Sequence, residues 1–146
     1  MKKFFAGTDF PLGATNIFDF QNPESFVCQV EQYRVSHKTL IIRVQAALSD
    51  QFYLVFSPVS YFEGPTAWQG ANFYVGSSAE YLNLIYRAQS LNQVSDERLQ
   101  QVSAASSSTL GRLFKVDTPN LRVRFTASEV VLTDDIAEMT DLSVKE

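Results

Sequence analysis

Histidine and cysteine are almost missing from this chain of 146 residues, which has one of each, His37 and Cys28. A single cysteine excludes an intrachain disulfide and a cysteine-based zinc site, and it fits a reducing compartment. One histidine excludes histidine-rich metal sites, and no Gly-x-Ser-x-Gly elbow accompanies it. If His37 lies in a turn, Cys28 is about nine strand residues or roughly 30 Å away, which excludes a Cys-His pair. The sequence therefore predicts no metal, no cofactor and no enzyme active site.

Long hydrophobic runs are also missing. No apolar run approaches the length that crosses a bilayer. The N-terminus begins with Lys2 and Lys3, but the apolar run after them ends at Ala6, which is too short for a secretory signal. The net charge of −4 argues against unspecific nucleic-acid binding, which needs a cationic face. These absences predict a soluble, cytoplasmic protein with no membrane partner and no unspecific nucleic-acid partner.

What the chain has in quantity is apolar and aromatic residues, with 45% hydrophobic residues and 12 phenylalanines. A chain of this length buries roughly 70% of its unfolded surface, which is enough for one sizeable core. Aromatic residues favour strands, so the composition indicates a sheet-rich fold. We expect residues 1–146 to form a single globular domain.

Alternation of apolar and polar residues predicts seven strands. They are residues 26–35, 40–48, 51–57 and 72–75, and then, after a helix, 112–117, 120–127 and 129–133. The alternation slips near Glu31 or Gln32, where we expect a β-bulge. Short connections around residues 36–39 and 49–50 join the first three strands into an antiparallel meander.

One helix interrupts the strands. Ser77 and Glu80 form a capping box, and apolar residues recur at helical spacing from Tyr81 to Leu91. We expect a helix over residues 78 to about 92, and a second start signal at Ser95 leaves open whether one or two helices follow.

The two ends of the chain show no clean period. Residues 1–25 mix phenylalanines with glycine, proline and asparagine, and we expect an irregular arm that shields apolar surface at an edge or face of the sheet. Residues 134–146 form an acidic tail, which is typical of a short terminal helix or of frayed chain.

These elements predict an α+β fold. We expect an antiparallel sheet of about six or seven strands, arranged as meander, helix and meander, with the helix packed on one face. The alternative is a β-sandwich or partly closed barrel with a peripheral helix.

A small cationic stripe is the first candidate site. Lys115, Arg122 and Arg124 flank the turn at Thr118 and Pro119, and alternation places them on one exposed face of a hairpin. Such a stripe suits a carboxylate, a phosphate or an acidic partner. The alternative interpretation is an ordinary solvated face of an antiparallel sheet, which commonly carries such residues.

The second candidate is the aromatic loop Tyr61–Gln69, bent at Gly64 and Pro65. Rigid aromatic side chains are typical of recognition surfaces, so we expect Tyr61, Glu63 and Trp68 to contact a partner, with Trp68 as the anchor. The alternative is that the aromatic residues of the loop fold inward and cap the sheet.

The sequence leaves three classes of function open. A non-catalytic binding domain that acts on another protein through the aromatic loop, by inhibition or scaffolding, is first, and self-association into a homo-oligomer is compatible with it. A small-molecule binder with a pocket between sheet and helix is second. An enzyme that uses Asp, Glu and Tyr is third.

Overall fold

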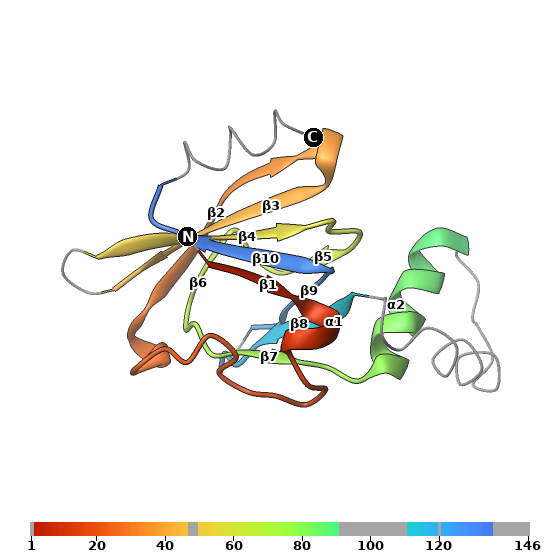
Figure 1. The fold of residues 1–146 in the computed structure, drawn as a ribbon, viewed down its shortest axis with the longest axis horizontal. Coiled ribbons are helices and arrows are strands. Elements are labelled where there is room, and N and C mark those ends of the chain that lie inside the picture. The colour runs from red at the N-terminus through yellow and green to blue at the C-terminus, as the bar shows by residue number, and fades with distance from the viewer. Residues whose placement is uncertain (1, 47–49, 91–110, 120, 136–146) are drawn as a thin grey trace.

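The computed structural model of the protein describes residues 2–46, 50–90, 111–119 and 121–135, with the backbone alone over residues 85–90. Within these residues the chain is mostly antiparallel sheet with few helices (Figure 1). The N-terminal half contains β1 (Lys2–Phe5), α1 (Ala6–Asp9), η1 (Pro23–Ser25), β2 (Val27–Arg34), η2 (Val35–His37), β3 (Thr39–Gln45) and β4 (Gln51–Ser57). The remainder contains β5 (Phe62–Glu63), β6 (Ala67–Gln69), β7 (Phe73–Val75), α2 (Ser78–Ser90), β8 (Arg112–Val116), β9 (Val123–Ala127) and β10 (Glu129–Thr133).

The strands form two sheets that do not close into a barrel. One has the order β1-β10-β4-β3-β2-β6 and the other the order β5-β9-β8-β7, with antiparallel pairing throughout. The coarse prediction of a mixed α+β fold dominated by antiparallel sheet therefore holds, but the expected single sheet is wrong, and of the alternatives a fold of two sheets is closer than a barrel. The meander β2-β3-β4 is present, but β10 leaves β9 and pairs with β4 and β1. Val130 and Val131 are buried on opposite faces of β10, as a central strand requires.

The core lies between the two sheets and is centred on Phe56 of β4, which is fully buried. Its ring contacts Phe125 and Phe114 of the four-stranded sheet, at centroid distances of 4.5 and 5.2 Å. Edge-to-face contacts of this kind stabilise a core beyond the area that they bury. Because one residue of each pair comes from each sheet, these contacts hold the two layers together.

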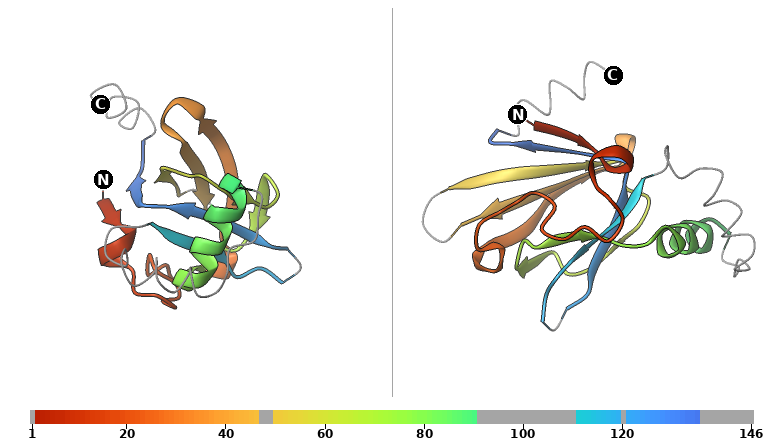
Figure 2. Two further views of the ribbon diagram at one scale, coloured as in Figure 1. Left: turned by 90° about the vertical axis from the view of Figure 1, so that its right-hand side faces the viewer. Right: turned by 60° about the horizontal axis from the view of Figure 1, so that its bottom comes forward.

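The N-terminal arm differs from the expected irregular chain at its start, because residues 2–5 form β1. After α1 the arm runs along the outer edge of β7, where Gly13 donates to Val75 O at 3.1 Å and Ile17 to Phe73 O at 3.1 Å. Its phenylalanines, including Phe18, pack against the core. The arm thus shields an open sheet edge, as the sequence indicates (Figure 2).

Each of the seven predicted strand segments overlaps a strand, with differences of up to three residues at the ends, and the short edge strands β1, β5 and β6 were not predicted. The expected bulge is confirmed, since the register of β2 against β3 shifts between Val30 and Gln32. The capping box is also confirmed: Glu80 N donates to Ser77 Oγ at 3.1 Å, and Ser77 N donates to Glu80 Oε1 at 3.2 Å.

Helix α2 begins at the expected residue, and it packs against β8. It lies at one end of the two sheets rather than across a face (Figures 1 and 2). The predicted second helix start at Ser95 lies outside the described residues, as does the tail over residues 136–146. No helix among the described residues is long and apolar enough to cross a membrane.

Candidate binding site on the four-stranded sheet

The outer face of the four-stranded sheet carries a row of polar side chains that crosses all four strands. Glu63 of β5 is opposite Arg124 of β9, Arg124 is opposite Lys115 of β8, and Lys115 is opposite Tyr74 of β7. Directly opposed residues point to the same side of a sheet. The neighbours of this row in sequence, such as Phe114 and Phe125, point inward and are fully buried. Alternation around Lys115 and Arg124 therefore places a charged outer face over an aromatic core.

Ion pairs fix the charged groups of this row. Arg124 Nε donates to Glu63 Oε1 at 2.6 Å, and Arg122 Nη1 lies 3.8 Å from the other oxygen of the same carboxylate. Lys115 Nζ pairs with Glu80, which projects from the first turn of α2. The side chain of Arg122 is 69% exposed and that of Arg124 is 23% exposed. Arg122 is thus the cation most open to an incoming group.

Two tyrosines border the cations. The guanidinium of Arg124 lies over the ring of Tyr61 at 5.8 Å, and Lys115 Nζ lies 5.9 Å from the ring of Tyr74. The hydroxyl of Tyr61 donates to Glu63 Oε1 at 2.7 Å. Cation–π contacts hold the flat face of each ring against a positive group. We call Tyr61, Glu63, Tyr74, Lys115, Arg122 and Arg124 the charged face.

The pairing shifts the acid–base behaviour of these groups. The hydrogen bond from Tyr61, followed by that from Arg124, lowers the pKa of Glu63 below its ordinary value. Burial, followed by the hydrogen bond to Glu63, raises the pKa of Tyr61. The hydrogen bond from Lys115 lowers the pKa of Glu80. Near neutral pH both carboxylates are charged and the phenol is protonated, so the network keeps its ion pairs.

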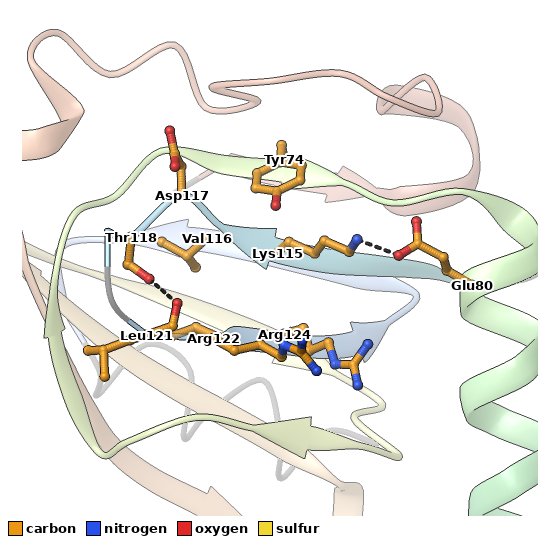
Figure 3. Close-up of a pocket in the computed structure, with 10 residues that line it drawn as sticks. Tyr74, Glu80, Lys115, Val116, Asp117, Thr118, Leu121, Arg122 and Arg124 are labelled. Atoms are coloured by element: carbon orange, nitrogen blue, oxygen red, sulfur yellow. Dashed lines mark hydrogen bonds and ion pairs between the residues drawn. The ribbon is translucent and has the colours of Figure 1, made fainter.

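A pocket of about 330 Å³ opens on this face, beside the start of α2. Figure 3 shows Lys115 directed toward Glu80, with Arg124 of the neighbouring strand β9 beside Arg122, which directly precedes that strand. The turn between β8 and β9 closes one end, where Thr118 Oγ1 donates to Leu121 O at 2.5 Å. The other lining residues are Tyr74, Val116, Asp117 and Val123. Three cationic side chains line the pocket beside two carboxylates, Glu80 and Asp117, and Glu80 is already paired with Lys115. An acidic group of a ligand would therefore be bound at the arginine side of the pocket.

The predicted anchor is in the core instead. Trp68 is 4% exposed, and its Nε1 donates to Gly70 O at 3.0 Å within the protein. The physical reason is β6, which pairs with β2 and turns Trp68 inward opposite the buried Cys28. The prediction that Trp68 contacts a partner is therefore wrong, and the inward-folding alternative holds for this residue. Tyr61 and Glu63 are only half-buried and stay candidates.

The structure brings the two predicted sets of site residues together. Glu63, which was assigned to the aromatic loop, pairs with Arg124 and Arg122, which were assigned to the cationic stripe. Sequence reasoning missed Tyr74 and Glu80 as members of the site. Alternation in β7 places Tyr74 outward, but only the strand pairing places it beside Lys115.

Two further features concern metal binding and the single thiol. In the described part of the chain, no set of three or more His, Cys, Asp or Glu side chains lies close enough together to hold a metal ion. Burial raises the pKa of Cys28 to about 12, and its Sγ lies 3.4 Å from Gly70 O.

Comparison of the chain with family models, with curated proteins and with solved structures finds no match.

Proposed function

We propose that this protein is a non-catalytic interaction domain that binds an acidic segment of another protein through the charged face. The observation that supports it is the convergence of Lys115, Arg122 and Arg124 on one open pocket, with Glu63 paired to two of them. A cytoplasmic, reducing setting belongs to the proposal, because the one cysteine is a free thiol and the sequence has no second cysteine with which it could form an intrachain disulfide.

The charges of the face are arranged so that one cation is available and the others are held in place. Glu80 holds Lys115 and Glu63 holds Arg124, so neither side chain must be ordered when a partner arrives. Arg122 is highly exposed and only loosely paired, at 3.8 Å. An arginine fork binds a carboxylate through two parallel hydrogen bonds. A partner carboxylate therefore meets Arg122 first, beside a preorganised Arg124.

The test is capture of partners from the native host by the wild type, by Arg122→Glu and by a matched control, Lys2→Glu. Lys2 is exposed on β1 of the other sheet, so the control makes the same charge change away from the charged face. We expect Arg122→Glu to lose the bound proteins and Lys2→Glu to keep them. Added salt should weaken the wild-type interaction, since exposed charges are screened. Equal recovery by all three proteins would contradict the proposal.

The fold should survive the substitution at Arg122. An exposed ion pair contributes about 0–1 kcal/mol, and this pair is long. A circular dichroism melt of each variant checks this. Loss of binding by a protein that melts with the wild type is then a property of the surface.

A second candidate function is binding of a small anion, and the position of the pocket favours it. The pocket lies where the sheet meets the first turn of α2, as the small-molecule alternative requires, although it is lined by charged groups. A small carboxylate or phosphate compound would then raise the melting temperature of the isolated protein. Arg124→Gln should abolish that rise, because this guanidinium is fixed within the pocket.

A further inference from the structure

We infer that the acidic segment also inserts one large apolar side chain into a groove at the open edge between the two sheets. This inference rests on the proposed function and adds a second requirement to the partner. The groove has a volume of about 310 Å³. We call it the apolar groove, and its walls include Val30, Tyr33, Val59, Tyr61, Phe62 and Thr66.

The groove begins where strand pairing on the outer side of β2 ends. β6 pairs with Val27, Cys28 and Gln29, and Val30 N then donates to Thr66 O at 2.7 Å. Beyond that point β2 bulges, and the chain from Val59 to Phe62 forms the facing wall. Tyr33 links the two walls through a hydrogen bond from its hydroxyl to Val59 O at 3.1 Å. These backbone and side-chain hydrogen bonds therefore fix the position of one wall relative to the other.

The inside of the groove is apolar and reaches the core. Leu40 and Val59, which line it, are each 2% exposed and belong to the core between the sheets. Phe62 packs against that core from the side of β5, and Tyr33 at the rim is 46% exposed. An apolar group that enters here adds to an existing core, which is where interface anchors contribute most. The volume lies at the lower end of the range for small-ligand pockets, about 300–1,000 Å³, and suits one large side chain.

Tyr61 connects the apolar groove to the charged face and thereby identifies the occupant. It lines the groove, its hydroxyl bonds Glu63, and its ring lies 5.8 Å from the guanidinium of Arg124. A chain that crosses Tyr61 has cations on one side and an apolar hollow on the other. Because Tyr61 borders both, a carboxylate near Arg124 and a side chain in the groove belong to one short stretch of the same segment.

The experiment is selection of displayed random peptides on immobilised wild-type protein, followed by affinity measurement with a synthetic selected peptide. We expect the selected peptides to share an acidic residue and, close to it in sequence, a Phe, Trp, Leu or Ile. Replacing that apolar residue by Ala should weaken binding to the wild type about tenfold or more, as loss of an anchor does.

Two groove variants test the location. Thr66→Phe and Ser60→Phe each add a ring at the exposed rim of the groove, from opposite sides, and Thr66→Ser is the conservative control. We expect both Phe variants to bind the selected peptide about tenfold more weakly than the wild type does. Replacing the apolar residue of the peptide by Ala should then cause no further loss of binding to these variants. Circular dichroism shows whether each variant is folded. If one of them misfolds, the other still tests the groove.

The outcomes separate the two proposals. Acidic peptides without an apolar preference, unaffected by Thr66→Phe and Ser60→Phe, would overturn the groove inference and leave the proposed function standing. If the selected peptides are apolar, lack acidic residues and bind Arg122→Glu as well as the wild type, the proposed function is overturned, and so is the inference that one segment contacts both the charged face and the apolar groove. Selection without enrichment of either kind would overturn both.

Discussion

Replacement of Trp68 by alanine decides between a core residue and a surface anchor. The indole is 4% exposed and donates one hydrogen bond, to Gly70 O at 3.0 Å. Truncation of a buried large aromatic residue costs about 3–5 kcal/mol, of which the hydrogen bond supplies about 1 kcal/mol. We therefore expect Trp68→Ala to lower the free energy of unfolding by about 3–5 kcal/mol. For a domain with a total of about 5–15 kcal/mol, this is a large fraction.

The assay is urea unfolding followed by far-ultraviolet circular dichroism, because Trp68 is the only tryptophan and its fluorescence disappears in the variant. Trp68→Phe keeps most of the buried ring and removes the N–H group, so it should cost about 1–2 kcal/mol. Gln69→Ala is the control, since Gln69 is exposed in the same strand and its substitution should change stability by about 0.5 kcal/mol or less.

One result would refute this reasoning. If Trp68→Ala costs less than about 1 kcal/mol in folding and weakens partner binding about tenfold, the indole acts at the surface. The charged face would then have to share the partner with the loop. A large folding cost with unchanged slope against urea supports the core position.

Three further measurements test the helix start, the ion pairs and the thiol. Ser77→Ala should destabilise the protein by about 1 kcal/mol in urea unfolding, because the amide of Glu80 loses its acceptor, whereas an unchanged midpoint would contradict the cap. Glu63 and Glu80 have lowered pKa values in the folded protein, so their ion pairs contribute stability that is fully present above the ordinary carboxylate pKa of about 4.3 and is lost as the pH falls through the lowered values. The free energy of unfolding should therefore decline on acidification. The decline should be smaller in Glu63→Gln, which lacks one of the two carboxylates. Cys28, with its pKa raised to about 12, should resist a thiol reagent at about pH 8 until urea unfolds the protein, and rapid reaction of the native protein would show an accessible thiol.

Local pattern predicted the elements well where one face of a strand is buried and the other is not. β9 alternates Val123 and Phe125 inward with Arg124 outward, so its face could be read from the sequence. β10 carries three apolar residues in a row and is buried on two faces, and such a strand gives no alternation from which to assign its neighbours. This is why its transfer to the other sheet was missed.

The edge strands were missed for a different reason. β5 and β6 contain two and three residues, too few for a period to be recognised. Their pairing with β9 and β2 is a tertiary effect, and it decides which residues of the aromatic loop turn inward. Trp68 was assigned to the surface because the sequence shows a bend at Gly64 and Pro65 but not the strand partners that follow it.

The candidate site combines both situations. Lys115, Arg122 and Arg124 could be grouped from alternation within one hairpin, whereas their pairing with Glu63 depends on β5 and the pairing with Glu80 depends on the entry angle of α2. Side chains that are distant in sequence meet only after the strand order is known. The sequence therefore indicated the cations but not the network that orders them.

Three edges of the two sheets carry features that oppose the addition of a strand from another chain. The arm covers the edge of β7, Lys2 and Lys3 occupy the β1 edge, and β2 bulges beyond Val30. Edges with these features resist strand addition. A purely structural ion-pair row has no need of Arg122, which is the most exposed and most loosely paired cation of the charged face. A role in binding would account for an exposed arginine at this position. Because Arg122 contributes little to the ion pairs of the fold, its substitution should change recognition of a partner without changing stability.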